Sequence, residues 1–322
     1  MRDNPDWGPT VAALKAADRI AISCHVNPDG DALGSLLAAS LGLRQLGKET
    51  FPSWGSEPAA VPFGYQFLPG VDHIVQPGEV PVGVPFLALD CGAQDRLGTL
   101  ADHIGKAPVS INIDHHPGNE DFATHNIVIT TASSTAEIVT RVLQDLGVTI
   151  DRDIATNLYV GIVTDTGRFQ YANSTPDTLR LAADLLALGV DAPAIAQEVY
   201  ESSPFGFMKL VGRVLDRAVL FEPERFVYSW ITLDDLDETG VAMDETDKLI
   251  DMVRSTRAAD AAGLFKQQRD GKWRVSMRSK GPNVGALARS RGGGGHDLAA
   301  GFTADDIETT VKGLAADLGA AS

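Results

Sequence analysis

The stretch RIAISCHVNPDGDALGSLLAASLGLRQLG, residues 19–47, contains one complete strand–loop–helix unit. Its first residues, Arg19–Ser23, are apolar enough for a buried strand, and a polar loop follows them. From Ala32 to about Leu46 the leucines recur at helical spacing, and Gly47 is a typical helix stop. The apolar stripe of this helix consists of Leu33, Leu36, Leu37 and Leu41. A strand, a loop and an amphipathic helix in this order are typical of a βαβ unit in a parallel sheet.

The same alternation continues through the first half of the chain. Short apolar runs at Phe86–Leu89 and Val109–Ile113 predict two more strands, and charged residues follow each of them at once. Helices are expected at Thr135–Leu146, Arg152–Thr164 and Pro176–Leu188, and a glycine follows the first and the third. We therefore predict an α/β fold with a doubly wound, mainly parallel sheet that binds ligands at the carboxyl ends of its strands.

The pattern changes in the second half of the chain. A helical stretch, Pro193–Arg217, leads to a smaller α+β region. Its elements are expected as strands at Val219–Phe221, Phe226–Thr232, Ala261–Gln267 and Trp273–Ser279, and as helices near Met243–Arg254 and Asp306–Leu318. We interpret the acidic run DDLDETG, Asp234–Gly240, as a solvated loop. The predicted organisation is a domain at residues 1–190, a helical linker at 191–217 and a second domain at 218–322.

Composition limits the function. The 322 residues include 27 Lys and Arg against 43 Asp and Glu, a formal net charge of −16. This charge repels polyanions, so we exclude long duplex nucleic acid and anionic membranes as general partners. The two cysteines, Cys24 and Cys91, exclude a disulfide framework and a cysteine-rich zinc site, and we expect both to be small buried residues. No apolar run resembles a signal peptide or reaches the length of a membrane span, so the expected location is the cytoplasm.

Acidic residues and histidines gather in four segments that follow predicted strands or end a predicted helix. These segments are CHVNPDGDALGS (24–35), LDCGAQDRLG (89–98), IDHHPGN (113–119) and GIVTDTGRFQYANST (161–175). If they belong to one sheet, their ends meet at one edge of it. Four carboxylates would then lie together, from Asp29, Asp31, Asp90 and Asp165, beside the imidazoles of His25, His115 and His116.

Such a cluster predicts bound cations. Four like charges in a small space repel one another, and burial increases the repulsion, so something must neutralise them. Two divalent cations carry four positive charges, and a mixed set of oxygen and nitrogen ligands suits Mn²⁺ better than Mg²⁺. Two ions about 3.5–4 Å apart are the usual device for phosphate ester hydrolysis, in which a shared hydroxide attacks phosphorus.

Single members of this cluster have simpler explanations. Asp31 could be only the N-cap of the following helix, and Asp29 a turn residue after Pro28. Asp90 and Asp114 could be ordinary polar residues at strand ends. The coincidence of acids and histidines at several strand ends of one predicted domain favours the metal interpretation.

The motifs HVNPDGDALGS, ALDCG, IDHH and TDTG resemble, in this order, the four motifs of the DHH phosphoesterase superfamily. The segment RSKGPNVGALARSRGGGGHDLAAGF, residues 278–302, is similar to the DHHA1 substrate-binding domain that accompanies it. Together they resemble the nano-RNase (oligoribonuclease) and pAp-phosphatase branch over nearly the whole chain. The resemblance implies a manganese-dependent phosphoesterase that hydrolyses short oligoribonucleotides to 5′-mononucleotides. It suggests pAp (3′-phosphoadenosine 5′-phosphate) as a further substrate.

The resemblance also implies roles for single residues. One metal ion would be held by His25, Asp29 and Asp90. The other would be held by Asp31, Asp90, His115 and Asp165, so that Asp90 bridges the two ions. His116 would stabilise charge at the scissile phosphate, and Asp114 would orient the histidines. Two alternatives stay open, a packing role alone for Asp114 and a surface ion pair for Arg96, which could otherwise contact phosphate.

The second predicted domain contains a basic segment between Lys266 and Arg291. Its eight Lys and Arg face only Asp270, a net charge of +7 within a chain of −16. Successive glycines at Gly292–Gly295 allow backbone N–H groups to approach an anion closely. We expect phosphate or nucleotide binding by Arg278, Ser279, Asn283, Gly293, Gly294, Gly295 and His296. A solvated basic face and a flexible glycine loop are the alternatives.

Three other functions fit the sequence less well. A cyclic-dinucleotide (c-di-AMP type) phosphodiesterase is disfavoured because the chain lacks the membrane helices and sensory modules of the large enzymes of that kind. Inorganic pyrophosphatases share the metal domain type, but the GGGGH segment argues against that branch. A non-catalytic nucleotide-binding regulator should have lost some metal ligands, and all are present here. The expected partners are short RNA, pAp or dinucleotides, and only the resemblance suggests a homodimer.

Overall fold

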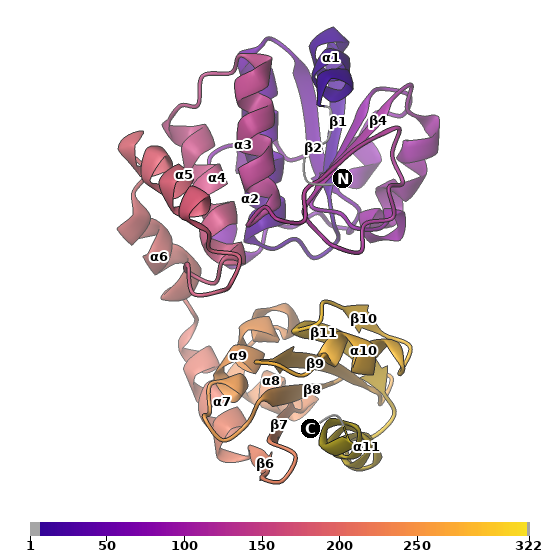
Figure 1. Cartoon of the computed structure of the whole chain (residues 1–322), viewed down its shortest axis with the longest axis vertical. Helices are drawn as coiled ribbons and strands as arrows, with labels where there is room; N and C mark the ends of the chain where they lie inside the picture. Colours follow the sequence, from indigo (N-terminus) through magenta and orange to yellow (C-terminus); the bar gives the residue numbers. More distant parts are fainter. Residues whose placement is uncertain (1–6, 321–322) are drawn as a thin grey trace. The chain divides into compact units, whose positions relative to one another are not determined.

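The computed structural model describes residues 7–320 of the chain. Two compact units divide it, Met1–Ser202 and Ser203–Ser322 (Figure 1). Every helix within the described range is too short or too polar to span a bilayer.

The boundary between the units falls inside the stretch that was expected to be helical, Pro193–Arg217. That stretch consists of two helices, α6 (Ala192–Tyr200) in the first unit and α7 (Phe205–Asp216) in the second. Pro204 precedes α7 directly, and proline disfavours a helical conformation at the residue before it. The helical pattern is therefore interrupted between Tyr200 and Phe205.

The first unit is built on a five-stranded parallel sheet with the strand order β2-β1-β3-β4-β5. Its strands are β1 (Arg19–Cys24), β2 (Glu49–Trp54), β3 (Phe86–Leu89), β4 (Ser110–Asp114) and β5 (His125–Val128). The sequence pattern did not predict β2 or β5, because Pro52 interrupts the first and His125 and Asn126 make the second polar. Both are edge strands, where a missing ladder donor and polar side chains are tolerated.

Apolar side chains cover both faces of this sheet, which confirms the expected doubly wound α/β fold. On β1, Ile20 and Ile22 belong to the larger core, whereas Ala21 contributes to a second core with Leu97 and Leu100. These leucines lie on the 3₁₀ segment η4 (Gln94–Lys106). On the larger core, α2, α3 and α4 contact one another (Figure 1). The α-helices of this unit are α1 (Gly8–Ala16), α2 (Gly30–Gln45), α3 (Thr135–Leu146), α4 (Arg152–Asp165), α5 (Pro176–Ala187) and α6.

The second unit contains a six-stranded mixed sheet with the order β10-β11-β9-β8-β7-β6. Only β7 and β8 pair in parallel within it. Its strands are β6 (Val219–Phe221), β7 (Phe226–Ile231), β8 (Ala261–Gln267), β9 (Trp273–Ser279), β10 (Gly294–Gly295) and β11 (Ala299–Ala304). Its helical segments are α7, α8 (Leu233–Thr239), η5 (Met243–Lys248), α9 (Leu249–Arg254), α10 (Val284–Arg289) and α11 (Ile307–Ala320). The four strands expected in this region are confirmed.

The acidic run at 234–240 is not a solvated loop, and that interpretation is wrong. It forms most of α8, and the Asp235 side chain is buried. Thr232 caps the helix through its hydroxyl, and the Asp235 carboxylate accepts from the Thr232 backbone N–H. Arg217 pairs with Asp235 at 2.6 Å, so the burial of this carboxylate is compensated. The Thr232 cap and the buried Arg217–Asp235 ion pair therefore stabilise a helix in an acidic run whose composition suggests a loop.

Candidate metal centre

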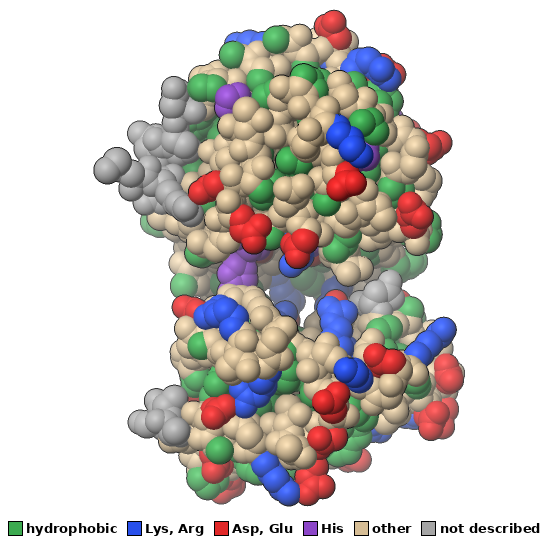
Figure 2. Space-filling view, turned by 90° about the vertical axis from the view of Figure 1, so that its right-hand side faces the viewer, with side chains coloured by type: hydrophobic (Ala, Val, Ile, Leu, Met, Phe, Trp, Pro, Cys, Tyr) green, Lys and Arg blue, Asp and Glu red, His purple; other side chains and the backbone are tan. Residues whose placement is uncertain are grey.

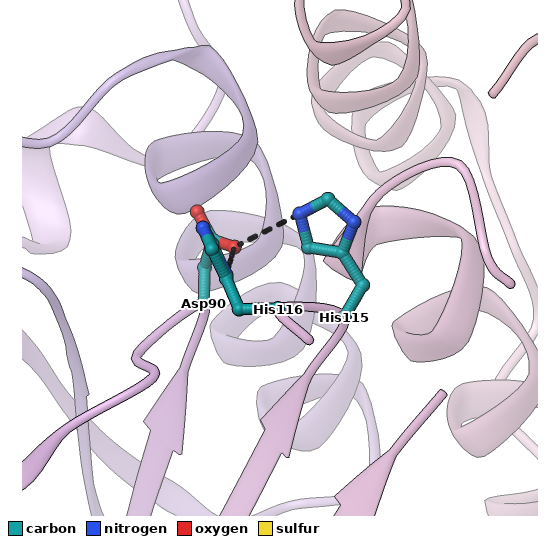
Figure 3. Close-up of side chains that lie close together, drawn as sticks. All are labelled: Asp90, His115 and His116. Carbon is teal, nitrogen blue, oxygen red and sulfur yellow. Dashed lines mark ion pairs between the residues drawn. The ribbon is translucent and has the colours of Figure 1, made fainter. Parts of the chain in front are cut away.

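The carboxyl ends of three parallel strands place most of the expected residues. His25 follows β1, Asp90 follows β3, and Asp114 is the last residue of β4. Figure 3 shows Asp90 at the end of one strand with His115 and His116 at the end of the next, and both imidazoles are directed toward its carboxylate. Because the strands are parallel neighbours, residues distant in the sequence meet at one sheet edge.

A close contact between α2 and α4 brings the remaining two carboxylates to this edge. α2 begins at this edge and carries Asp31 in its first turn, and α4 ends there with Asp165. Because α2 and α4 pack against each other, the two carboxylates lie close together. A Cβ added to Gly34 would lie 2.4 Å from the Asn157 carbonyl oxygen of α4, and one added to Gly161 would lie 2.8 Å from Asp31 Oδ1. The helices therefore approach this closely only because glycine occupies both positions.

The ligand atoms form two groups that share Asp90. In the first, His25 Nε2 lies 3.5 Å from Asp90 Oδ2 and 3.9 Å from Asp29 Oδ1. In the second, His115 Nε2 lies 3.7 Å from Asp90 Oδ1 and 3.5 Å from Asp165 Oδ2.

Asp31 belongs to the second of these groups. Its Oδ2 lies 4.0 Å from His115 Nε2. Within these two groups, three sets of ligand atoms lie close enough together to hold an ion: His25–Asp29–Asp90, Asp31–His115–Asp165 and Asp90–His115–His116. All six expected metal ligands are thus brought together.

The aspartates also hold the local backbone. Asp29, not Asp31, is the N-cap of α2, and its Oδ1 accepts from the backbone N–H groups of Asp31 and Ala32. Asp31 is buried in the first turn of α2 and accepts from the backbone N–H groups of Thr135 and Ala136, at 2.6 and 2.9 Å. These two donors belong to the start of α3, where helix N–H groups have no partner within the helix. The simpler structural roles therefore coexist with a position in the cluster.

Asp90 adopts an unusual backbone conformation. Its φ is +55°, in the left-handed region that aspartate tolerates better than most residues. The Thr135 hydroxyl donates to Asp90 Oδ1 at 3.0 Å. Sequence reasoning missed Thr135, although it starts a helix that the pattern predicted, because nothing local indicates that α3 begins beside β3.

His116 is oriented by a buried polar network. Its Nδ1–H donates to Asp114 Oδ1 at 2.7 Å, and Asn119 Nδ2 donates to Asp114 Oδ2 at 2.6 Å. Asn119 Nδ2 also donates to Asn112 Oδ1, and Asn112 Nδ2 donates to the Cys91 carbonyl. Asp114 therefore contacts one histidine of the pair through a hydrogen bond, in addition to being fully buried. Asn119 is the last residue of the motif IDHHPGN, and the sequence pattern alone did not indicate a role for it.

Asn119→Ala should reduce the turnover of the metal-loaded enzyme about 10–100-fold, because Asp114 loses the donor that fixes its rotamer and thereby the His116 ring. Asn126→Ala is the matched control, since within the described part of the chain the Asn126 side chain bonds only to the backbone of Ala123. Steady-state kinetics would show the loss in kcat with KM nearly unchanged. A folded Asn119→Ala variant with unchanged kcat would contradict the positioning role.

Burial and mutual charge shift the pKa values of the cluster. Burial lowers the pKa of His25, but hydrogen bonding to Asp90 and the nearby carboxylates outweigh it and raise this pKa to about 9. Burial raises the pKa of Asp165 to about 7, although His115 opposes the rise. Burial and the neighbouring carboxylates also raise the pKa of Asp31. The cluster therefore retains protons near neutral pH when no cation is bound.

The donor set fits divalent cations. Each group combines imidazole nitrogen with carboxylate oxygen, a mixture found at transition-metal sites. The raised pKa values of His25 and Asp165 mean that a cation must displace protons from these side chains when it binds. The described residues can therefore hold a divalent cation in this cluster.

Arg96 is the one expected residue of this unit that makes no side-chain hydrogen bond or ion pair among the described residues. It lies exposed on η4, and its backbone carbonyl accepts from Val26. No surface ion pair holds it, and its contact with phosphate stays a prediction.

The cysteines are both free and fully buried, as expected. Cys24 contributes to the larger core, and Cys91 contributes to the core on the other face of the sheet. Burial raises the pKa of both thiols, that of Cys91 to about 12.

The expected substrate residues of the second unit lie in adjoining segments. Ser279 N–H donates to the Leu298 carbonyl, and Asn283 Nδ2 donates to Asp297 Oδ1 at 2.7 Å. Asn283 is also the N-cap of α10, a structural role. The glycine run is partly strand β10, and a Cβ on Gly293 would lie 2.1 Å from the Gly301 carbonyl oxygen. The glycines are therefore needed for close packing of β10 on β11, while the Gly294 position is open.

The basic segment is not the strongly positive face that its composition suggested. Lys266 is buried and pairs with Asp247, and Arg278 Nε lies 3.8 Å from Asp251 Oδ1. Lys272 and Arg291 pair with Asp305 and Asp317. Figure 2 shows Lys and Arg side chains of this unit interspersed with acidic ones. Acidic residues outside the segment therefore offset much of its charge.

Comparisons with known proteins identify both units. A family model described as the DHH family, N-terminal domain, matches residues 19–162, and one described as the DHHA1 domain matches residues 224–318. The chain is 35% identical over 311 residues to the bifunctional oligoribonuclease and PAP phosphatase NrnA of Thermus thermophilus, over 94% of this chain and 88% of the relative.

Solved structures agree with this assignment. An exopolyphosphatase-related protein from Bacteroides fragilis has a TM-score of 0.88 at 26% identity, over 96% of this chain and 94% of that chain. RecJ of Thermus thermophilus in complex with Mn²⁺ has a TM-score of 0.56 at 16% identity, over 97% of this chain and 54% of RecJ, which shows a shared fold alone. The two matching domains and the relative at 35% identity confirm the resemblance seen in the sequence, and the chain belongs to the DHH family of phosphoesterases with a DHHA1 domain.

Proposed function

We propose that this protein hydrolyses short oligoribonucleotides to 5′-mononucleotides and removes the 3′-phosphate of pAp, using bound divalent cations. One observation carries the proposal: the Asp90 carboxylate lies between His25 Nε2, 3.5 Å from one oxygen, and His115 Nε2, 3.7 Å from the other. A carboxylate shared by two ligand groups is what a pair of cations at a phosphate ester requires. The Thermus relative, named an oligoribonuclease and PAP phosphatase, supports the substrate class.

Two cations are proposed, and Mn²⁺ is the metal that the mixed ligand set favours. The first would be held by His25, Asp29 and Asp90. The second would be held by Asp31, His115 and Asp165 together with Asp90, which contacts His115. When bound, the ions would supply an activated water and neutralise charge on the phosphate. RecJ, of the same fold, has been crystallised with Mn²⁺.

His116 is proposed as the catalytic residue that stabilises charge at the scissile phosphate. Its side chain is 29% exposed, against 8% for His25 and 14% for His115, so it is the histidine of the cluster most accessible to substrate. Asp114 holds its Nδ1–H, which leaves Nε2 directed away from that carboxylate. Burial lowers the pKa of His116, but Asp114 and Asp90 raise it to about 9, so the ring holds a proton that can stabilise charge on phosphate.

The second unit is proposed to bind the part of the substrate that is not cleaved. Of the expected set, solvent reaches the side chains of Arg278, which is 30% exposed, and of Asn283 and His296, which are both exposed. Gly294 leaves open space where a side chain would stand, so backbone N–H groups of the glycine run can approach a phosphate. Ser279, Gly293 and Gly295 complete the proposed set.

An assay of four substrates tests the proposal. The purified protein is incubated with Mn²⁺ and, separately, with pApA, pAp, cyclic di-AMP and pyrophosphate, and products are quantified by chromatography. We expect AMP from pApA and from pAp, and the loss of both activities when the metal is chelated. Cleavage of cyclic di-AMP alone would favour the cyclic-dinucleotide enzyme. Tight nucleotide binding without any product would favour a non-catalytic regulator and contradict the proposal.

The substrate class also implies a cytoplasmic location, which stays a prediction. A homodimer is proposed as well, by likeness to the family alone.

A further inference from the structure

A strained turn follows Asp165, one of the proposed metal ligands. Residues 167–169, a glycine, an arginine and a phenylalanine, have φ values of +56°, +62° and +61°, all in the left-handed region. Arginine and phenylalanine rarely adopt this conformation, and holding them there costs stability. Nearby, Asn173 Oδ1 and Ser174 Oγ are buried without a hydrogen-bond partner in the described part of the chain, which is a second cost. Strain and unpaired polar atoms concentrate in segments that are shaped for function.

The turn is bonded to the backbone of this ligand. Asn173 Nδ2 donates to the Asp165 carbonyl oxygen at 3.2 Å and to the Ser133 carbonyl oxygen at 2.8 Å. The Tyr171 N–H donates to the Thr166 carbonyl oxygen at 3.0 Å. The segment therefore closes on itself directly after α4, and the residues at 167–171, here called the 167–171 turn, stay a few residues from the metal cluster.

Tyr171 has the properties of a stacking platform. A Cβ added to Gly167 would lie 2.4, 2.5 and 2.7 Å from Cζ, Cε2 and Cε1 of the Tyr171 ring. The ring therefore lies against the Gly167 backbone, at a place that only glycine leaves free. The Tyr171 side chain is nevertheless 43% exposed. An aromatic ring that the protein supports on one side and leaves open to solvent suits the base of a single-stranded nucleic acid.

Arg168 adds a positive charge beside this ring. Its Cζ lies 4.6 Å from the centroid of the Tyr200 ring. Burial raises the pKa of Tyr200 to about 12, Arg168 opposes the rise and Tyr171 adds to it, which places both side chains near Tyr200. Arg168 is exposed, and within residues 7–320 its guanidinium forms no ion pair or hydrogen bond. Stacking on Tyr200 orders the guanidinium plane and leaves its N–H edge available to a phosphate.

The two proposed substrates differ in one nucleoside. In pAp and in pApA the scissile phosphate is attached to the 3′ oxygen of an adenosine, but only pApA has another nucleoside beyond that phosphate. The second unit is proposed above to bind the part that is not cleaved, and one binding surface of this kind is enough for pAp. A dinucleotide has a further base, and the 167–171 turn belongs to the unit that carries the metal cluster.

We propose that the 167–171 turn binds the nucleoside on the 3′ side of the scissile phosphate, with its base stacked on Tyr171, an inference that rests on the proposed function. In a longer chain another phosphate follows this nucleoside. It lies beyond the charge that the cations neutralise, so it needs a cation from the protein, and Arg168 supplies it. Stacking accepts every base, so this subsite distinguishes substrates by length and not by sequence.

Steady-state kinetics with pAp, pApA and the trinucleotide pApApA test the subsite. Tyr171→Ala should raise the KM for pApA about tenfold, as expected for the loss of one stacked base, and should leave the KM for pAp unchanged. Tyr171→Phe should retain the wild-type values, because a phenyl ring stacks as well. Arg168→Gln should raise the KM for pApApA about tenfold, as expected for the loss of a charged hydrogen bond, with little effect on pApA.

Matched controls and a spectroscopic readout complete the test. Phe205→Ala, at an exposed ring of α7, and Arg180→Gln, at an exposed arginine of α5, should change none of these values. A dinucleotide with 2-aminopurine as its second base reports stacking through the quenching of its fluorescence. It is bound to the His116→Asn variant, in which turnover is slowed and every proposed metal ligand is kept. Quenching should be strong in this variant and should be lost when Tyr171→Ala is added.

The outcomes separate this inference from the proposed function. An unchanged KM for pApA in Tyr171→Ala, an equal rise for pAp and pApA, or quenching that persists without the Tyr171 ring would each overturn the subsite and leave the proposed function in place. A wild-type chain that hydrolyses neither pAp nor pApA would contradict the proposed function itself, and the subsite with it.

Discussion

Asp90→Asn should lower hydrolysis of pApA about 1,000-fold or more and remove most of the stabilisation that metal gives the protein. Asp90 is the carboxylate shared by both ligand groups, so its loss affects both proposed cations at once. A 1,000-fold loss corresponds to about 4 kcal/mol of transition-state stabilisation, within what bound metal supplies. Asparagine keeps the size of the side chain, so the fold around β3 should be preserved.

Thermal unfolding with and without Mn²⁺ measures the second part of this prediction. Saturation at about 100 times the dissociation constant stabilises a protein by about 2.7 kcal/mol, and a unit of this size gains about 2–4 °C in Tm per kcal/mol. The wild-type chain should show this rise and Asp90→Asn should not. Asp95→Asn, at an exposed residue of η4, is the matched control and should behave as wild type. An Asp90→Asn variant that keeps the full metal-induced rise would contradict the shared-ligand role.

The apparent affinity for Mn²⁺ should increase at least about 100-fold between pH 6 and pH 8. In the metal-free protein the pKa of His25 is raised to about 9 and that of Asp165 to about 7, so both groups are protonated at pH 6. A cation must displace these protons, and each one displaced below its pKa costs a factor of ten per pH unit. His25 alone accounts for the 100-fold change, and Asp165 adds to it below pH 7.

The stability of the metal-free protein should follow the opposite course. A raised pKa in the folded state gives stability that is complete below the unfolded value, 6.5 for His25 and 3.8 for Asp165, and that is lost as pH rises through about 9 and about 7. The Tm without metal should therefore fall as pH rises from 6 to 9, while the Tm with saturating metal should not.

Calorimetric titration with Mn²⁺ in buffers of different ionisation enthalpy counts the protons that the protein releases when metal binds. The Asp165→Asn variant should release fewer protons than the wild type. A Mn²⁺ affinity that does not depend on pH would contradict the displacement of protons by the cation.

The local sequence pattern was sufficient to predict an element where all the residues that determine the element lie within one segment. The stretch at 19–47 predicted β1 and α2 because its apolar residues, its capping loop and its closing glycine all lie within it. The metal cluster could be predicted for a related reason: His25, Asp90 and Asp114 follow recognisable strands, and parallel strands bring their ends together.

The errors arose where the partner is distant in the sequence. The run at 234–240 is helical because Arg217 neutralises Asp235 and Thr232 caps the turn, and none of this is visible in the composition of the run. Lys266 was counted in a basic face, yet it is buried against Asp247, 19 residues earlier. Thr135 joins the site only because α3 starts against Asp31. Such pairings are products of tertiary packing, which periodicity does not encode.

The two aspartates that begin α2 have a consequence for how a cation is captured. Asp29 accepts N–H groups of its own helix, and Asp31 those at the start of α3, so these side chains are ordered by the folding of the helices themselves. The ligand side chains are thus ordered before a cation binds. A cation that binds displaces protons and does not have to order flexible loops. We therefore expect such a centre to lose and regain bound cations without reorganisation of the surrounding chain.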